Sequence, residues 1–315
     1  MGLNFQEIAK KWFDGKKRLI KPSSVSAYHT IVFAGLLPYF SEKEINNQTV
    51  QQYVIDCTFK KKYSKRTVQD HIKILTYILK EGENNGLCKA QVFDVELPSI
   101  LDMRKRESRA FSISDIKKLR SYLIDNSVDN IYNFAILLSL SLGLRIGEVT
   151  GLKFSDFDFR NKMVHISRTS QRIINYDELT GLYRKTLVNI GTTKTKSSNR
   201  KVPISETLLN LVEIYLEGKS SDDFIFKGKF TKMPMDNRLL RERYYGVLEK
   251  LNLPKITFHG LRHSFASNCI ASNIDIKTTS AMLGHSDIKM TLEIYTHPSF
   301  EQKKAAVNKL GKLLS

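Results

Sequence analysis

One segment near the middle of the chain is apolar on nearly every side. Residues 131–142 read IYNFAILLSLSL and carry no charge. A helix without a polar face has to be covered by other elements all round, so we expect it at the centre of a core. Gly143 follows at once, and glycine is the residue best suited to a left-handed helix cap. The segment therefore predicts a mainly helical domain built around one buried helix.

Amphipathic segments precede this run and predict a small N-terminal domain of four helices. In each segment the apolar side chains recur at the three- and four-residue spacing of one helix face. Residues 98–110 then combine a proline with a run of charge, which is typical of a linker between domains. We predict a helical domain at residues 1–97 and a linker at 98–110. The predicted helices cover residues 3–18, 22–39 and 49–59, and the stretch that follows Ser64.

The second domain, residues 111–315, is expected to be mostly helical with one small antiparallel β-sheet. Its first helix starts beside Ser112 or Ser114, and either serine suits a helix N-cap. Residues 153–204 change character, because short β-branched runs separated by turn residues are typical of strands. Helices return after residue 205, and a tail helix closes the domain. Its apolar stripe comprises Val307, Leu310, Leu313 and Leu314.

The composition points to a polyanionic partner. The formal net charge of +18 and the pI near 9.6 attract nucleic acid, and the excess of Lys and Arg is spread over both halves of the chain. Two such domains would close around a DNA duplex like a clamp. The first domain contains a basic cluster at residues 60–66, for which a solvated loop is the alternative interpretation. The DNA-binding candidates in this cluster and in the linker are Lys60, Lys61, Lys62, Lys65, Arg66, Arg104, Lys105 and Arg106.

The sequence lacks the marks of secreted, membrane and metal-dependent proteins. Its three cysteines are far apart and show no metal-ligand spacing, which argues against a disulfide framework and a zinc site. Lys10 and Lys11 interrupt any apolar signal peptide, and no run of 18 apolar residues could span a membrane. No glycine-rich phosphate loop is found. We expect a cytoplasmic protein whose chemistry needs neither ATP nor a metal or other cofactor.

Two arginines, two histidines and one tyrosine lie in settings that suggest chemistry on an anion. Arg145 follows the core helix. Arg262 lies one helical turn after His259, so the two share a helix face. His285 lies at a predicted turn, and Tyr295 follows on the next helix. Attack on a phosphodiester builds negative charge on its nonbridging oxygens, and fixed arginines stabilise that charge. The pattern therefore indicates a phosphodiester substrate, with the phenol as nucleophile.

That chemistry also needs a base and an acid. A phenol with a pKa of about 10 is a poor nucleophile at neutral pH, and His259 is the candidate base. The departing 5′ oxygen needs a proton, which a lysine supplies if nearby cations lower its pKa. Lys194 and Lys196 both lie in a turn-rich stretch that suits this role. Taken singly, each group is more often structural than catalytic, so the hypothesis depends on their joint order.

Four motifs hold these residues: LSLGLRIGEVTGL at Leu140–Leu152, TKTKSSNRKVPI at Thr193–Ile204, HGLRHSFAS at His259–Ser267 and MLGHSDIKMTLEIYTH at Met282–His297. Together they resemble the motifs of the tyrosine recombinases of the phage-integrase family. The first domain is similar to the family's core-binding domain in position and size, though not in motif. The resemblance implies a site-specific DNA recombinase, or integrase, that cuts a strand through a 3′-phosphotyrosyl bond and rejoins it to a partner strand.

The resemblance also implies roles for single residues. A pattern of Lys-Thr before a Ser-x-x-Arg-x-x-Pro strand favours Lys194 over Lys196 as the general acid. Glu148 matches an acidic position that helps to order the site, and Tyr295 matches the nucleophile. The residues implied to activate the phosphate are Arg145, Lys194, His259, Arg262 and His285.

The expected partner is double-stranded DNA with specific recombination sites, held by a homotetramer. In relatives a segment after the nucleophile docks into a neighbouring subunit, and the apolar stripe of the tail suits that task. Packing of the tail on its own domain is the alternative. No β-rich module precedes the first helical domain, so an additional arm-site-binding domain is not expected.

Two other functions are alternatives to a recombinase. A type I topoisomerase with this chemistry relaxes DNA without exchanging partners. A non-catalytic DNA-binding regulator with this fold has no need of a tyrosine placed after Leu-Gly-His, which argues against it. Integration of a phage or mobile element, promoter inversion and dimer resolution all use the recombinase chemistry.

Overall fold

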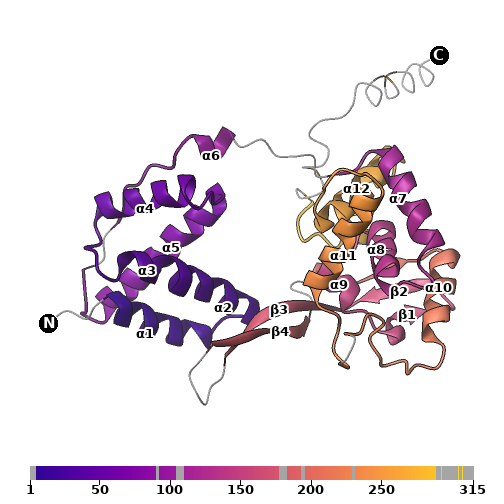
Figure 1. The fold of residues 1–315 in the computed structure, drawn as a ribbon, viewed down its shortest axis with the longest axis horizontal. Helices are drawn as coiled ribbons and strands as arrows, with labels where there is room; N and C mark the ends of the chain where they lie inside the picture. Colours follow the sequence, from indigo (N-terminus) through magenta and orange to yellow (C-terminus); the bar gives the residue numbers. More distant parts are fainter. Residues whose placement is uncertain are drawn as a thin grey trace. The chain divides into compact units, whose positions relative to one another are not determined.

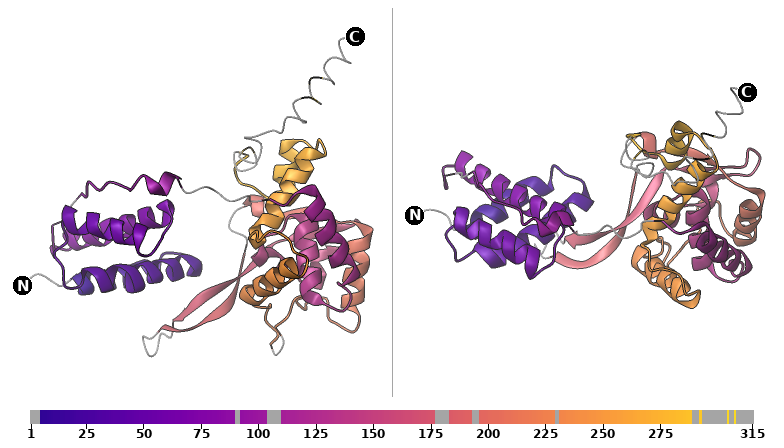
Figure 2. Two further views of the ribbon diagram at one scale, coloured as in Figure 1. Left: turned by 45° about the horizontal axis from the view of Figure 1, so that its top comes forward. Right: turned by 90° about the horizontal axis from the view of Figure 1, so that it is seen from above.

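The structure is a computed structural model that describes residues 5–89, 92–103, 110–176, 183–192, 196–228, 231–288, 292, 304 and 307. The chain divides into two units, whose elements are drawn in Figures 1 and 2. The first unit comprises residues 1–106 together with 173–187. The second comprises residues 107–172 together with 188–315. A segment from the middle of the chain thus groups with the N-terminal helices.

The N-terminal part of the first unit is helical, as the apolar stripes predict. Two helix starts are fixed by side chains: Asn46 accepts a hydrogen bond from the backbone N–H of Thr49, and Ser64 accepts one from Thr67. Its elements are α1 (Phe5–Lys17), α2 (Pro22–His29), a π-helical turn η1 (Thr30–Leu36), α3 (Leu37–Phe40), α4 (Asn47–Phe59), α5 (Lys65–Asn84) and α6 (Ile100–Met103).

The core of the first unit comes from the apolar faces of these helices, and Phe13, Phe40 and Tyr53 are almost fully buried in it. Leu101 of α6 joins the same core. The first unit therefore extends beyond residue 97. Residues 173–187 contact the N-terminal helices of this unit, because Ile174 N donates a hydrogen bond of 2.8 Å to Ser26 Oγ.

The second unit is built around α8 (Ile131–Leu142), as the sequence predicts. Residues 133–140 of this helix are all buried, and α7, α11 and α12 pack on it. Asn130 caps its start, and Gly143 ends it with a φ of 64°. The other helical elements are α7 (Ile113–Asp125), α9 (Ile146–Thr150), η2 (Phe154–Asp156), η3 (Lys196–Ser198), α10 (Glu206–Leu216), α11 (Asn237–Lys250), α12 (Phe258–Ala271) and α13 (Ile276–Leu283).

Among the described residues, the strands form two small sheets instead of the single sheet expected. Strands β1 (Phe157–Asp158), β2 (Met163–Ile166) and β5 (Arg200–Pro203) pair in that order and antiparallel. Strands β3 (Arg168–Tyr176) and β4 (Tyr183–Thr192) pair separately. In β5 buried and exposed residues alternate, which turns Arg200 and Val202 inward. No helix among the described residues is long and apolar enough to cross a membrane.

Candidate active site

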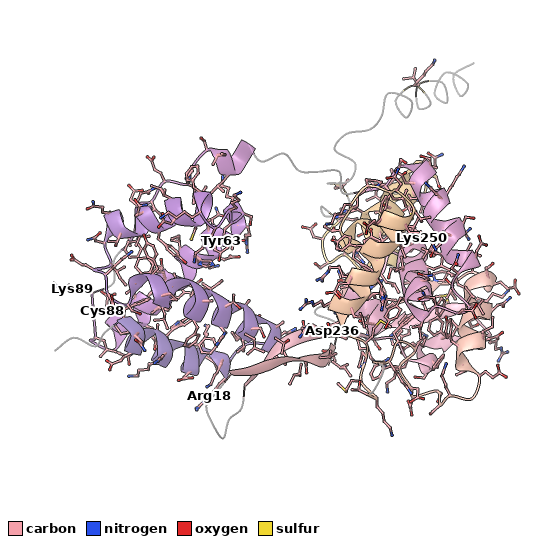
Figure 3. All side chains as sticks on the ribbon, viewed as in Figure 1. Arg18, Tyr63, Cys88, Lys89, Asp236 and Lys250 are labelled. Atoms are coloured by element: carbon pink, nitrogen blue, oxygen red, sulfur yellow. The ribbon has the colours of Figure 1, made fainter. Side chains whose placement is uncertain are left out.

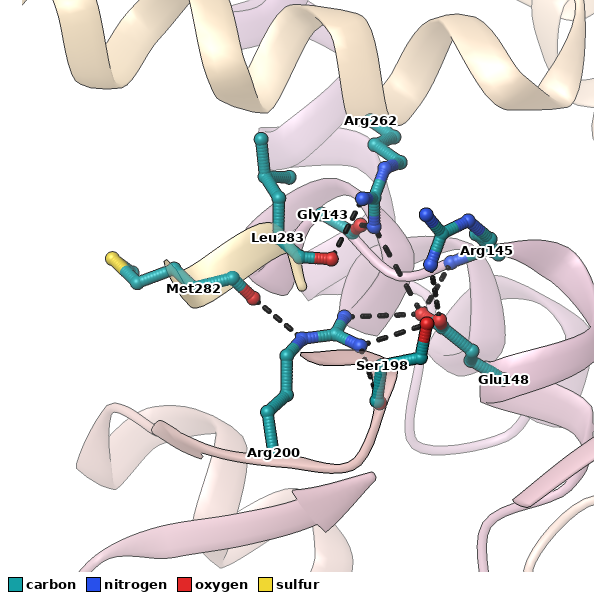
Figure 4. A network of polar contacts seen from close by, with 8 residues as sticks. All are labelled: Gly143, Arg145, Glu148, Ser198, Arg200, Arg262, Met282 and Leu283. Carbon is teal, nitrogen blue, oxygen red and sulfur yellow. Dashed lines mark hydrogen bonds and ion pairs between the residues drawn. The ribbon is translucent and has the colours of Figure 1, made fainter. Parts of the chain in front are cut away.

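Two helix C-termini meet at Arg262. Helices α8 and α13 both end at a left-handed glycine, Gly143 and Gly284. Arg262 of α12 donates one hydrogen bond to the Gly143 carbonyl (3.0 Å) and one to the Leu283 carbonyl (2.6 Å), and only 2% of it is exposed (Figure 4). The last carbonyls of a helix lack partners within the helix and carry partial negative charge. They therefore give a buried cation a favourable place.

One carboxylate lies among three guanidinium groups. Figure 4 shows Arg145, which precedes α9, Arg200 of β5 and Arg262 of α12 pointing toward Glu148. Arg145 donates to Glu148 from its backbone N–H (3.0 Å) and from Nη1 (2.7 Å). Arg200 donates from Nη1 (3.3 Å) and Nη2 (3.0 Å), and Arg262 Nη1 lies 4.0 Å away. Three cations against one carboxylate leave the cluster positively charged.

These charges change the acid–base properties of the cluster. Burial alone raises the pKa of Glu148, but the hydrogen bonds and charge of Arg200, and then the charge of Arg145, outweigh it and hold that pKa below the ordinary value. Burial, followed by the charges of Arg145 and Arg200, lowers the pKa of Arg262 to about 9. Glu148 is therefore ionised and Arg262 still charged at neutral pH.

Two imidazoles belong to the same cluster. His285 follows the left-handed Gly284, and His259 lies on the exposed side of α12. Burial, followed by the charges of Arg262, Arg145, Arg200 and His259, lowers the pKa of His285 to about 4. His285 is thus a neutral hydrogen-bonding group at physiological pH. The ring of His263 stands at right angles to that of His259, with 4.8 Å between their centroids.

The glycines before Arg145 and His285 are required by their surroundings. A Cβ on Gly143 would lie 2.7 Å from side-chain atoms of Leu283 and Phe265. Both glycines have a positive φ, which other residues adopt only at a cost. Each glycine lets the chain turn sharply out of a helix. The residues just after it are thereby directed into the cluster.

The structure brings five predicted site residues together: Arg145, Glu148, His259, Arg262 and His285. Tyr295 and Lys194 lie outside the described residues, as do Arg104, Lys105 and Arg106 and most of the tail. Lys196 begins η3, but its side chain is not described. Within the described ranges, His, Cys, Asp and Glu side chains do not form a group of three that could hold a metal ion.

Sequence reasoning assigned no role to Arg200, although it lies in one of the quoted motifs. Its side chain is 6% exposed and forms the bidentate pair with Glu148. A signal was available, since strand alternation places Arg200 on the same side as the apolar Val202. A buried arginine needs a buried partner, although strand alternation does not say which residue that partner is.

The basic cluster of the first unit lies at the end of α4 and the start of α5. Lys60, Lys61, Lys62 and Arg66 are exposed, and Lys65 is half-buried. Acidic neighbours partly neutralise it, since Lys60 pairs with Asp56 at 3.0 Å and Arg66 with Asp70 at 3.3 Å. Lys61 Nζ lies 5.8 Å from the centre of the Tyr63 ring, which is labelled in Figure 3.

Comparisons with known proteins agree on one family. The model of the phage integrase family matches residues 109–302. A XerC-like tyrosine recombinase of Caldanaerobacter subterraneus is 30% identical over 220 residues, which cover 66% of this chain and 55% of the relative. The transposase of transposon Tn916 from Enterococcus faecalis is 28% identical over 269 residues, which cover 79% of this chain and 63% of the relative. The chain thus spans little more than half the length of these relatives.

Solved structures share the fold. The Tn1549 transposon integrase in complex with transposon right end DNA superposes with a TM-score of 0.76 at 20% identity, over 98% of this chain and 100% of that one. Lambda integrase bound to DNA gives a TM-score of 0.62 at 14% identity, over 90% of this chain and 92% of that one. At such identities the likeness shows the fold alone. The family model, in contrast, covers more than half of the 315 residues and includes all five clustered site residues, and on that ground the chain belongs to the phage integrase family.

Proposed function

We propose that this protein is a site-specific DNA recombinase that cuts and rejoins strands through a covalent bond to Tyr295. The observation that carries the proposal is the cationic cluster of Arg145, Arg200 and Arg262 around Glu148, with the neutral His285 beside it. Positive charge and hydrogen-bond donors fixed before the reaction stabilise the charge that develops on a phosphodiester in its transition state. Such a cluster suits phosphoryl transfer.

In the proposed reaction the phenolic oxygen of Tyr295 attacks the scissile phosphorus, and the bond to the 5′ oxygen breaks. His259 accepts the phenolic proton, and Lys194 gives a proton to the departing oxygen. Arg145, whose side chain is about one-third exposed, and Arg262 would hold the nonbridging oxygens. The 5′-hydroxyl of a partner strand then attacks the phosphotyrosine and releases the tyrosine. The phosphate bond is exchanged and not hydrolysed, so the reaction needs no ATP.

A suicide substrate tests the proposal. A duplex nicked next to the cleavage point loses its short 5′ fragment on cutting, so the protein stays covalently attached to the 3′ end. We expect a protein–DNA adduct with the wild type and none with Tyr295→Phe, while both bind DNA with similar affinity. An adduct with Tyr295→Phe, or none with the wild type, would refute the proposed function.

The assembly and the partner are part of the proposal. The partner would be double-stranded DNA with specific sites, bound through the basic cluster that starts at Lys60 and the basic residues 104–106. The protein would act in the cytoplasm. The affinity of binding through phosphates falls steeply as the salt concentration rises.

Four protomers would act on two paired sites, with the tail after Tyr295 docked on a neighbouring protomer. Deletion of residues 300–315 should then abolish strand exchange; unchanged exchange and assembly would contradict the docking.

The names of the relatives favour a mobile genetic element as the source of the DNA, since they include a transposon transposase and the integrase of Staphylococcus phage L54a. A recombination assay with two sites on one plasmid separates this function from relaxation by a topoisomerase. A recombinase yields deleted or inverted plasmids. A topoisomerase changes only the supercoiling.

A further inference from the structure

Arg200 contacts several separate parts of the candidate site. Its Nη1 and Nη2 donate to the two oxygens of Glu148, and its Nε donates to the Met282 carbonyl at 2.6 Å. Its Nη1 also donates to the Ser198 carbonyl at 3.2 Å. Four of the five N–H donors of a guanidinium are thus used by three separate segments of the protein.

We propose that Arg200 is a positioning residue for the phosphate-binding part of the site, an inference that rests on the proposed function. It holds Arg145 through Glu148, and it holds the turn of His285 through the Met282 carbonyl. It is not itself a catalytic residue, because it is 6% exposed and its donors are directed at protein groups. A phosphate would meet Arg145 and Arg262 instead.

The contact with Glu148 fixes Arg145. Each oxygen of Glu148 accepts one hydrogen bond from Arg145 and one from Arg200, so the carboxylate lies between the two residues. Paired N–H donors hold a carboxylate in one plane. Without Arg200, Glu148 would face only Arg145 and the more distant Arg262. The carboxylate would then be free to rotate and to take Arg145 with it.

The contact with Met282 fixes the turn that carries His285. The stem of Arg200 packs at Gly284, where an added Cβ would lie 2.9 Å from Arg200 Cδ and 2.7 Å from the Ser197 carbonyl oxygen. Strand β5 therefore touches the end of α13 through both a hydrogen bond and the methylene groups. Loss of Arg200 would leave the Met282 carbonyl without this donor and open space beside the turn.

Substitution of Arg200 tests this inference in the full-length protein. A displacement of about 1 Å in a reacting group costs about 100-fold in rate, so we expect Arg200→Ala to lower the single-turnover cleavage rate on the suicide substrate by about 10- to 100-fold. DNA affinity should change by less than about threefold, because Arg200 touches no phosphate in this scheme. Arg200→Lys should recover only part of the rate, since an ammonium lacks the planar fork.

Arg168→Ala is the matched control. Arg168 Nη1 pairs with the buried Asp156 at 2.6 Å in the same unit, and Asp156 is not one of the clustered residues. If loss of an ion pair to a buried carboxylate were the whole effect, each alanine variant would lose rate in proportion to the stability that it loses. We expect only the Arg200 variants to lose it. Equal rates for the two alanine variants would overturn the inference, and if Arg200→Ala fails to fold, Arg200→Lys is compared with Arg168→Lys in the same way.

A second substrate separates positioning of the phosphate from positioning of the general acid. A 5′-bridging sulfur leaves as a thiolate and needs no proton, so it bypasses the lysine. We expect Arg200→Ala to lose the same factor on the sulfur substrate as on ordinary DNA. Recovery of the rate on the sulfur substrate would overturn the inference, because Arg200 would then act through the segment of Lys194 and Lys196. A wild type that forms no adduct would refute the proposed function itself.

Discussion

Substitution of the buried carboxylate Glu148 tests how strongly its ion pairs with Arg145 and Arg200 stabilise the protein. Glu148 is 3% exposed and accepts four hydrogen bonds, all from Arg145 and Arg200. Glu148→Gln keeps the shape but removes the charge, and it turns an amide N–H₂ toward a guanidinium. Breaking a buried ion pair on one side costs about 3–5 kcal/mol. In a domain of about 200 residues, each kcal/mol lowers the melting temperature by about 2–4 °C.

The matched control is Asp156→Asn, the same chemical change at a second buried carboxylate. Asp156 accepts from Lys153 N (2.8 Å) and Arg168 Nη1 (2.6 Å) through one oxygen, which an amide carbonyl can replace. Burial outweighs these contacts and raises the pKa of Asp156. The protein therefore stabilises the ionised form of Asp156 less than it stabilises that of Glu148. We expect this variant to lose less than about 1 kcal/mol.

The dependence on pH follows from the two opposite pKa shifts. The lowered pKa of Glu148 contributes stability that is present above the unfolded value of about 4.3 and is lost as the pH falls through the folded value. The advantage of the wild type over Glu148→Gln should therefore shrink in acid. The raised pKa of Asp156 has the opposite effect. The stability of the wild type relative to Asp156→Asn should therefore increase as the pH falls.

Urea unfolding of the wild type and both variants is followed by circular dichroism from pH 7 down through the range in which Glu148 takes up its proton, below its unfolded pKa of about 4.3. A loss for Glu148→Gln that is no larger than that of Asp156→Asn would refute the reasoning. So would a difference that does not change with pH.

Three further outcomes are expected. The hydroxyl of Tyr244 is buried and has no hydrogen-bond partner among the described residues, so Tyr244→Phe should raise the free energy of unfolding by about 1 kcal/mol in urea titrations; a loss of that size would contradict this. Gly284→Ala should lower both the stability and the cleavage rate, because the residue has a φ of 67° and the added Cβ would meet the Ser197 carbonyl. Gly246→Ala is the control: its added Cβ lies in open space, so it should stabilise α11 by about 0.5–1 kcal/mol in thermal melts. NMR should show no titration of the His285 ring between pH 5.5 and 8, because its pKa is lowered to about 4; the unfolded chain takes up that proton near pH 6.5, so stability should fall as the pH drops below this value.

Local features predicted the frame of the second unit correctly. The uncharged run at residues 131–142 predicted a central helix, and the structure buries it among α7, α11 and α12. Gly143 predicted a left-handed end, and its φ is 64°. These predictions succeeded because burial of an apolar helix and the freedom of glycine act over a few neighbouring residues.

Contacts between distant residues could not be predicted in the same way. Arg200 and Glu148 are separated by 52 positions, and their pairing depends on how β5 lies against α9. Ile174 and Ser26 are 148 positions apart, so nothing in their local sequence groups them in one unit. The two sheets differ from the single sheet expected for a similar reason. Strand propensity marks where strands lie but leaves their pairing to tertiary packing.

The carboxylate in this cationic site has a physical explanation, although it opposes the binding of an anion. Three guanidinium groups drawn together and largely removed from water repel one another, and desolvation adds to that cost. Glu148 offsets it where the three meet. The deeply buried Arg200 directs its donors at Glu148 and at backbone carbonyls, while Arg145 remains about one-third exposed. Arg200 and Glu148 together are close to neutral and stabilise the fold. The charges of Arg145 and Arg262 are then left for the phosphate.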